Sequence, residues 1–217
     1  MKNLLFFVSI LFILNFYSSC KKNNAETVHI PQEFKDYTVF PEGSWWIYEE
    51  KHTGIKDSTY TYFSKCKFSD GRRFYGRDFG EVESCEFVNV SRGDSITSQS
   101  IFLGKNEDKS YIYIYIETNH SKTQTLNNHL LIHPIDSLPQ QVPTQGGHII
   151  TALDDTLSVG GRQYFNTIST STDGVVSENG AVPFNIKTCI FAKGIGKVYI
   201  HYHDGTIWEL VDYHIAD

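Results

Sequence analysis

Short runs of apolar and aromatic residues, each about as long as a β-strand, alternate with turn-forming residues along most of this chain. In the clearest runs, apolar and polar positions alternate with a period of two, which is typical of strands. No window keeps the i, i+3, i+4, i+7 spacing of a long amphipathic helix. The pattern predicts strands over residues 44–51, 58–68, 72–77, 83–90, 95–103, 110–117, 128–133, 156–158, 164–169, 186–191, 197–202 and 206–213.

Turn-forming residues separate these runs at hairpin spacing. Residues 53–57 join the first two predicted strands, and residues 203–205 (His-Asp-Gly) join the last two. An Asp-Gly pair between apolar runs is a strong hairpin signal. Because short turns connect antiparallel strands, we expect an all-β fold: an antiparallel sheet, a sandwich or a curved half-barrel. All three use the same alternating strands, so the sequence leaves the choice among them open.

The most regular alternation lies in residues 111–116, where tyrosine and isoleucine take turns. Successive side chains of a strand point to opposite faces, so the three tyrosines share one face and the three isoleucines share the other. We expect the isoleucine face to be core. The tyrosine face is either a second packing surface or an aromatic platform for a sugar or an apolar ligand. The predicted ligand face consists of Tyr111, Tyr113, Tyr115, Trp45 and Trp46.

The N-terminus has the pattern of an export signal. Lys2 precedes an almost wholly apolar stretch over residues 4–16, which is too short to span a bilayer and has the length of a signal-peptide core. The order Tyr-Ser-Ser-Cys over residues 17–20 resembles a bacterial lipobox, with tyrosine in place of the usual leucine. The resemblance implies cleavage before Cys20 and its acylation, including palmitate. The alternative is an ordinary secretory signal with a chance cysteine.

This interpretation divides the chain into a signal peptide over residues 1–19, a polar tether over 20–39 and a single β-rich domain over 40–217. The tether lacks periodicity and contains Pro31, so we expect it to lift the domain off a membrane. Several acyl chains anchor firmly, because each buried CH₂ contributes about 0.8 kcal/mol. No aspartate follows Cys20. Where that position acts as a sorting signal, its absence favours the outer membrane, and the periplasmic or surface face is left open.

Composition and charge exclude one class of partner. The chain has 25 Asp and Glu against 19 Lys and Arg, and a formal net charge of -6. A general nucleic-acid-binding protein needs a basic face, so we expect no nucleic-acid partner. Aromatic residues make up 14% of the chain, which suits a pleated sheet better than a helix. The expected partners are the membrane, through the N-terminal lipid, and an envelope protein or a small ligand.

Three cysteines remain once Cys20 is assigned to lipid. Cys66 and Cys85 lie on nearby predicted strands. An exported protein folds in an oxidising compartment, so these two are the preferred disulfide pair. The alternative leaves them and Cys189 as three separate buried thiols.

Residues 93–96 (Gly-Asp-Ser-Ile) resemble the GDSL block of a class of serine hydrolases, in which Ser95 would be the nucleophile. Such an enzyme needs a general base with an oriented partner. The chain offers only Asp212 and His214, one residue closer together than the DxxH of those hydrolases. Their fold also needs helices that the sequence does not show. The alternative interpretation of the segment is a turn between two strands.

His201 and His203 are spaced to share one face of a predicted strand, Asp204 follows them, and His214 lies on the predicted partner strand. Imidazole and carboxylate groups in such an array bind zinc, and the alternative is a solvated hairpin end. The sequence contains no P-loop, HExxH or paired CxxC motif. We therefore expect no catalytic residue, no metal and no cofactor.

Three segments together resemble a family of uncharacterised lipoproteins of Gram-negative bacteria. Residues 40–48 resemble its FPxGxxWxY opening, residues 159–167 a middle segment with a central glycine, and residues 191–198 its closing KGxGxV hairpin. The resemblance implies an exported, largely β protein, in some relatives a curved half-barrel around an apolar cavity, and no catalytic residues. We expect a membrane-anchored, non-enzymatic binding or structural module. The alternatives are a binder of a hydrophobic ligand or glycan on a concave aromatic sheet, and a hydrolase using Ser95.

Overall fold

The structure, a computed structural model, describes residues 27–71, 80–91, 96–105, 111–120, 125–133, 149–172 and 186–217. Within these residues one helix, α2 (Gln32–Thr38), precedes all of the strands. The strands are β1 (Trp45–Glu50), β2 (Lys56–Asp70), β3 (Glu81–Ser91), β4 (Ile96–Lys105), β5 (Tyr111–His120), β6 (Thr125–His133), β7 (Ile149–Val159), β8 (Arg162–Ser171), β9 (Ile186–Ala192), β10 (Gly196–Tyr202) and β11 (Ile207–His214).

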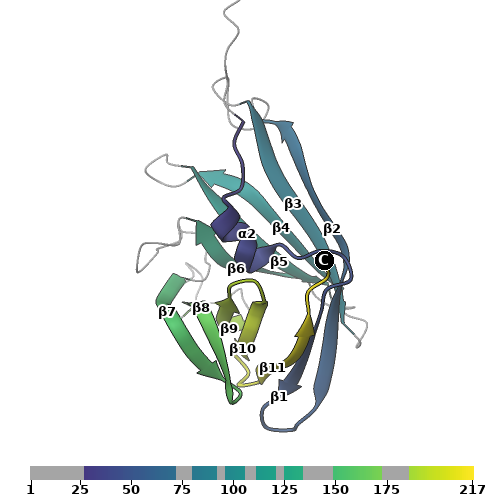
Figure 1. Cartoon of the computed structure of the whole chain (residues 1–217), viewed down its shortest axis with the longest axis vertical. Helices are drawn as coiled ribbons and strands as arrows, with labels where there is room; N and C mark the ends of the chain where they lie inside the picture. Colours follow the sequence, from purple (N-terminus) through teal and green to yellow (C-terminus); the bar gives the residue numbers. More distant parts are fainter. Residues whose placement is uncertain are drawn as a thin grey trace, which may run out of the picture. The chain divides into compact units, whose positions relative to one another are not determined.

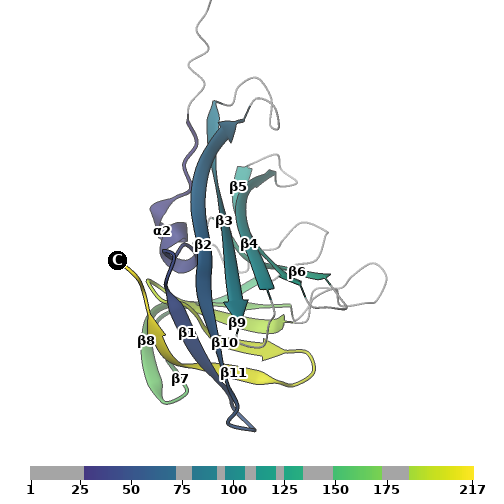
Figure 2. The ribbon, with the colours of Figure 1, turned by 90° about the vertical axis from the view of Figure 1, so that its right-hand side faces the viewer.

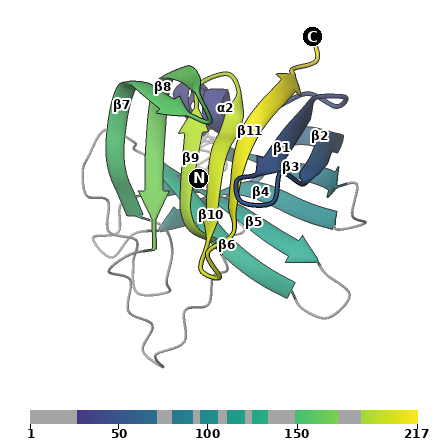
Figure 3. The ribbon, with the colours of Figure 1, turned by 90° about the horizontal axis from the view of Figure 1, so that it is seen from below.

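The strands form one antiparallel sheet, which confirms the predicted all-β fold class (Figure 1). Strands β1 to β6 follow one another across one part of the sheet (Figure 2), and strands β7 to β11 follow one another across the rest (Figure 3). The pairing of β1 with β11 joins the two series. The edge strands β6 and β7 also come into contact. The sheet therefore curls back on itself in the manner of the predicted half-barrel.

The chain divides into two compact units, Met1–Val28 with Asp70–Val82, and His29–Ser69 with Glu83–Asp217. In the first, a parallel bridge joins Val28 to Val82, and the Gly71 N–H donates to the Gly80 carbonyl at 2.7 Å. The second unit contains helix α2, nearly all of the sheet and the β10–β11 hairpin. No helix in the described ranges is long and apolar enough to cross a membrane.

One face of strands β9 to β11 points into the interior of the larger unit. Ile200 on β10 lies opposite Cys189 on β9 and opposite Trp208 on β11. Directly opposite residues of antiparallel strands share a face. We call this the core face. Its buried side chains are Cys189, Phe191, Val198, Ile200 and Leu210.

Helix α2 packs against the turn between β9 and β10 (Figure 1). The Gly194 N–H donates to the Asp36 carbonyl at 2.8 Å, and the Lys193 ammonium lies 3.3 Å from the Asp36 carboxylate. Phe34, on the helix, is fully buried. The predicted polar tether over residues 20–39 is therefore wrong from His29 onward, and the folded domain begins before residue 40. The error arose because one seven-residue helix is too short to show a sustained apolar period.

A buried ion pair ties α2 to strand β3. The Lys35 Nζ lies 2.6 Å from Glu83 Oε1, and the Ile30 N–H donates to Glu83 Oε2 at 2.9 Å. His29 Nδ1 lies 3.8 Å from the same carboxylate. These contacts satisfy the Glu83 carboxylate inside the protein, as a buried charge requires.

The segment after α2 reaches the start of β10 through one close contact. Gly196 has φ +93°, and a Cβ there would lie 2.9 Å from the Phe40 ring. Glycine therefore meets both a conformational and a steric requirement at this position.

Most predicted strands coincide with observed ones. Strand β7 is longer than the predicted 156–158, because Asp154 and Asp155 interrupt the apolar pattern without ending the strand. The predicted strand over 72–77 and the predicted loop over 138–147 lie outside the described residues.

Candidate functional site

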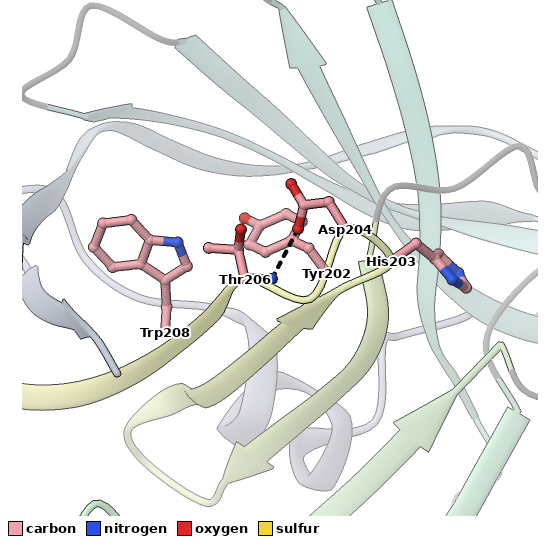
Figure 4. A pocket seen from close by; sticks show the side chains of 5 residues that line it. All are labelled: Tyr202, His203, Asp204, Thr206 and Trp208. Carbon is pink, nitrogen blue, oxygen red and sulfur yellow. Dashed lines mark hydrogen bonds between the residues drawn. The ribbon is translucent and has the colours of Figure 1, made fainter. Parts of the chain in front are cut away.

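An open cavity of about 470 Å³ lies at the end of the β10–β11 hairpin (Figure 4). Tyr202 ends β10 and Trp208 lies at the beginning of β11, so the two aromatic side chains come from the two arms of one hairpin. We call this cavity the hairpin pocket. The described residues that line it are Tyr202, His203, Asp204, Thr206 and Trp208.

The hairpin pocket continues the core face. Trp208 lies opposite Ile200, and Tyr202 lies two residues beyond Ile200 and opposite the buried Ile186. The Tyr202 N–H donates to the Thr206 carbonyl at 2.9 Å, which pairs these two residues across the turn. The turn that contacts α2 lies at the other end of β10. The core face therefore runs from the end near α2 to a cavity that is open to solvent.

The turn itself places a carboxylate at the edge of the pocket. Asp204 accepts a hydrogen bond from the Thr206 N–H at 2.8 Å, drawn as a dashed line in Figure 4. The backbone hydrogen bond from Thr206, followed by one from its side chain, lowers the pKa of Asp204. Asp204 is therefore anionic at neutral pH, and its side chain is exposed.

His203 is held at the side of the pocket. Its Nε2 lies 3.0 Å from the hydroxyl of Thr172, and its ring points away from Tyr202 and Trp208 (Figure 4). Thr172 is only 4% exposed, and its hydroxyl also donates to the Lys187 carbonyl at 3.3 Å. This hydroxyl and imidazole are within hydrogen-bond reach, but the hydroxyl is not accessible to a substrate.

A second acidic residue, Glu50, lies on the strand next to Trp208. Glu50, on β1, is the cross-strand partner of Trp208, which lies on β11, and Glu50 is buried. A hydrogen bond from the Thr53 side chain is the largest of the effects that lower the pKa of Glu50, and the N–H groups of His52 and Thr53 add to it. Within the described residues, neither Glu50 nor Asp204 forms an ion pair with a lysine or an arginine.

The structure separates the two tryptophans of the predicted ligand face. Trp46 is buried, and its indole N–H donates to the Ile195 carbonyl at 2.7 Å. Trp45 lies on the opposite face, across from the exposed Tyr60, with its ring centroid 6.1 Å from that of His214. Consecutive residues of a strand point to opposite faces. Only one of the two tryptophans can therefore belong to the predicted ligand face.

The backbone register of β5 bears on the predicted isoleucine core, which stays a prediction. Tyr115 lies opposite Ile101 on β4, which in turn lies opposite Cys85 on β3, and both of these are fully buried. Ile116 lies opposite Ser100, whose partner on β3 is the exposed Glu86. The tyrosine positions, not the isoleucine positions, are in register with the buried row. The side chains of residues 111–120 lie outside the described part, so a ligand role for Tyr111, Tyr113 and Tyr115 stays a prediction.

Cys66 and Cys85 are joined by a disulfide, the pairing that the sequence favoured, and Cys189 is buried and takes no part in it. The Glu83 carboxylate and both sulfur atoms lie within 4.8 Å of one another. Zinc binds cysteine as a thiolate, so two sulfurs bonded to each other do not provide a metal site.

The predicted zinc ligands are not brought together. The His201 ring meets the Tyr199 ring edge-on, with the two ring centroids 6.4 Å apart. His203 contacts Thr172 instead, and His214 lies near Trp45 at the far end of β11. Among the described residues, the ligand-atom cluster around Glu83 is the only one found. Cys20 and Ser95 lie outside these residues, so their predicted roles stay predictions.

Sequence reasoning did not find the hairpin pocket. A usable signal was present, because Tyr202 and Trp208 flank the predicted turn at positions that alternation places on one face. Comparison of the chain with protein-family models, with curated proteins and with solved structures gives no match. The function is therefore inferred from the geometry of the site itself.

Proposed function

We propose that this chain is a lipid-anchored protein of the bacterial outer membrane that binds a small organic ligand in the hairpin pocket without chemically changing it. The observation that carries the proposal is the opening of the core face into a cavity lined by Tyr202 and Trp208. Small-molecule sites are concave and mainly apolar, with a few polar groups that orient the ligand. Asp204 and Thr206 supply such groups here. The inaccessible Thr172 hydroxyl supports binding rather than catalysis.

The pocket is tested with the neutral fluorescent probe N-phenyl-1-naphthylamine, titrated into the exported chain carrying Cys20→Ala to keep it in solution. We expect saturable binding that Trp208→Ala weakens by about tenfold or more, a loss equal to about 1.4 kcal/mol of contact. Trp45→Ala is the matched control, because Trp45 lies on the opposite face of the sheet. Equal binding by both variants, or no binding by the parent chain, contradicts the proposal.

The anchor is tested by metabolic labelling with palmitate in a Gram-negative host. We expect the parent chain to be labelled and to fractionate with the outer membrane, and Cys20→Ala to lose both properties. Cys189→Ala is the control, because this thiol is buried in the folded domain and should not take lipid. A Cys20→Ala chain that still carries palmitate and stays on the membrane would show that the lipobox interpretation is wrong.

A further inference from the structure

We propose that the ligand of the hairpin pocket carries an organic cation, a quaternary ammonium or a protonated amine, bound against the rings of Tyr202 and Trp208 beside the carboxylate of Asp204, with Glu50 adding negative charge on the strand next to Trp208. This inference rests on the proposed function and names the chemistry of its ligand.

The charges around the pocket favour a cation. Asp204 lines the pocket and Glu50 is the cross-strand neighbour of Trp208. The hydrogen bonds that these carboxylates accept come from the turns next to them, and neither is neutralised by a lysine or an arginine of the described residues. The described lining residues include no lysine or arginine either. The titratable neighbours of these carboxylates are His201 beside Asp204 and His52 beside Glu50. An anionic ligand would therefore be repelled, and a cationic one attracted.

The aromatic side chains add a second attraction for the same ligand. A cation within about 6 Å of an aromatic ring is attracted by the negative face of the ring, and tryptophan is the strongest partner. The Trp208 and Tyr202 rings and the Asp204 side chain line the same pocket (Figure 4). Aromatic cages are the usual protein site for quaternary ammonium groups, and a carboxylate adds a Coulombic attraction for the same charge.

Other ligand classes fit these residues less well. A purely apolar chain would pack on Trp208 but would remove water from Asp204 without replacing its hydrogen bonds, which is unfavourable. An inorganic cation needs several ligand atoms that converge, and the described residues show no such cluster at this hairpin. An organic cation is attracted both by the aromatic rings and by the carboxylates.

The test compares choline with 3,3-dimethyl-1-butanol, its neutral isostere, on the ¹⁵N-labelled chain carrying Cys20→Ala. The chain has three tryptophans, so three indole N–H signals are expected, and Trp208→Phe assigns the one from the pocket. We expect choline to shift the Trp208 signal saturably, at a concentration about tenfold lower than the isostere needs. The signals of Trp45 and Trp46 should not move.

Asp204→Asn removes one charge and keeps an oxygen that accepts the Thr206 N–H bond. We expect it to weaken choline binding about fivefold or more and to leave the weak binding of the neutral isostere unchanged. Phosphatidylcholine vesicles form a second arm. Competition by vesicles for the Trp208 signal assigns the ligand to a lipid headgroup, and a response to free choline alone assigns it to a soluble amine.

Equal affinity for choline and its isostere overturns the inference, as does an Asp204→Asn chain that binds choline unchanged. The naphthylamine titration distinguishes a failure of the cation inference from a failure of the proposed ligand site. Binding of that probe without selective binding of choline removes the cation inference and keeps the ligand site, whereas loss of both removes the proposed function as well.

Discussion

Replacing Phe34 by alanine is expected to lower the free energy of unfolding by about 3–5 kcal/mol, because the substitution leaves a cavity around a fully buried side chain. The effect should lie toward the upper end of this range. Helix α2 has only seven residues, and a helix this short is not stable without its packing contacts. Urea unfolding followed by circular dichroism measures the change.

Phe165→Ala is the matched control, because this phenylalanine is 61% exposed on β8. Surface substitutions of this kind change stability by no more than about 0.5 kcal/mol. Similar losses for the two variants would show that α2 does not contribute to the core in the way that the structure indicates.

Lys35→Met is expected to destabilise the protein by about 3 kcal/mol, because it leaves the buried Glu83 carboxylate without its cationic partner. The estimate is at the lower end for a buried pair, since the Lys35 side chain is 21% exposed and water reaches part of the site. Methionine keeps most of the packing volume of the lysine stem, so the change reports mainly on charge. Chemical unfolding at neutral pH measures it.

Lys51→Met provides the control for an exposed pair. The Lys51 side chain is 51% exposed and lies 3.2 Å from Glu209, and such surface pairs contribute about 1 kcal/mol or less. Adding Glu83→Gln to Lys35→Met should recover part of the lost stability, because it removes the unpaired charge. A double variant less stable than Lys35→Met alone would contradict this explanation.

Both stability predictions concern contacts of α2, and the sequence predicted neither of them. Helix α2, which carries the buried Phe34, is held at the β9–β10 turn, where the Gly194 N–H donates to the Asp36 carbonyl. That contact joins residues far apart in the sequence, so a local pattern cannot reveal it. A polar segment with one proline was therefore read as a tether, although four of its residues are buried: Ile30, Phe34, Tyr37 and Thr38.

The disulfide was easier to predict than the site. Cys66 and Cys85 lie on β2 and β3, which are consecutive in the chain and adjacent in the sheet. Consecutive strands joined by short connections usually pair, so nearness in sequence was a fair guide to nearness in space. The proposed zinc ligands failed for the opposite reason. His214 is only ten residues beyond Asp204, but a strand carries it to the far end of β11.

By itself the sequence determined the strands, the hairpin turns and the antiparallel character of the fold. The physical reason is that the two-residue period and the turn residues act locally, through backbone geometry that each short segment carries. Alternation also placed Tyr202 and Trp208 on one face, as it did Tyr111, Tyr113 and Tyr115. Only the tertiary structure decided which of the two faces is buried, because that depends on curvature and register between strands. The tertiary structure also decided that Trp46 rather than Trp45 is buried, and it opened the core face into the hairpin pocket at Trp208.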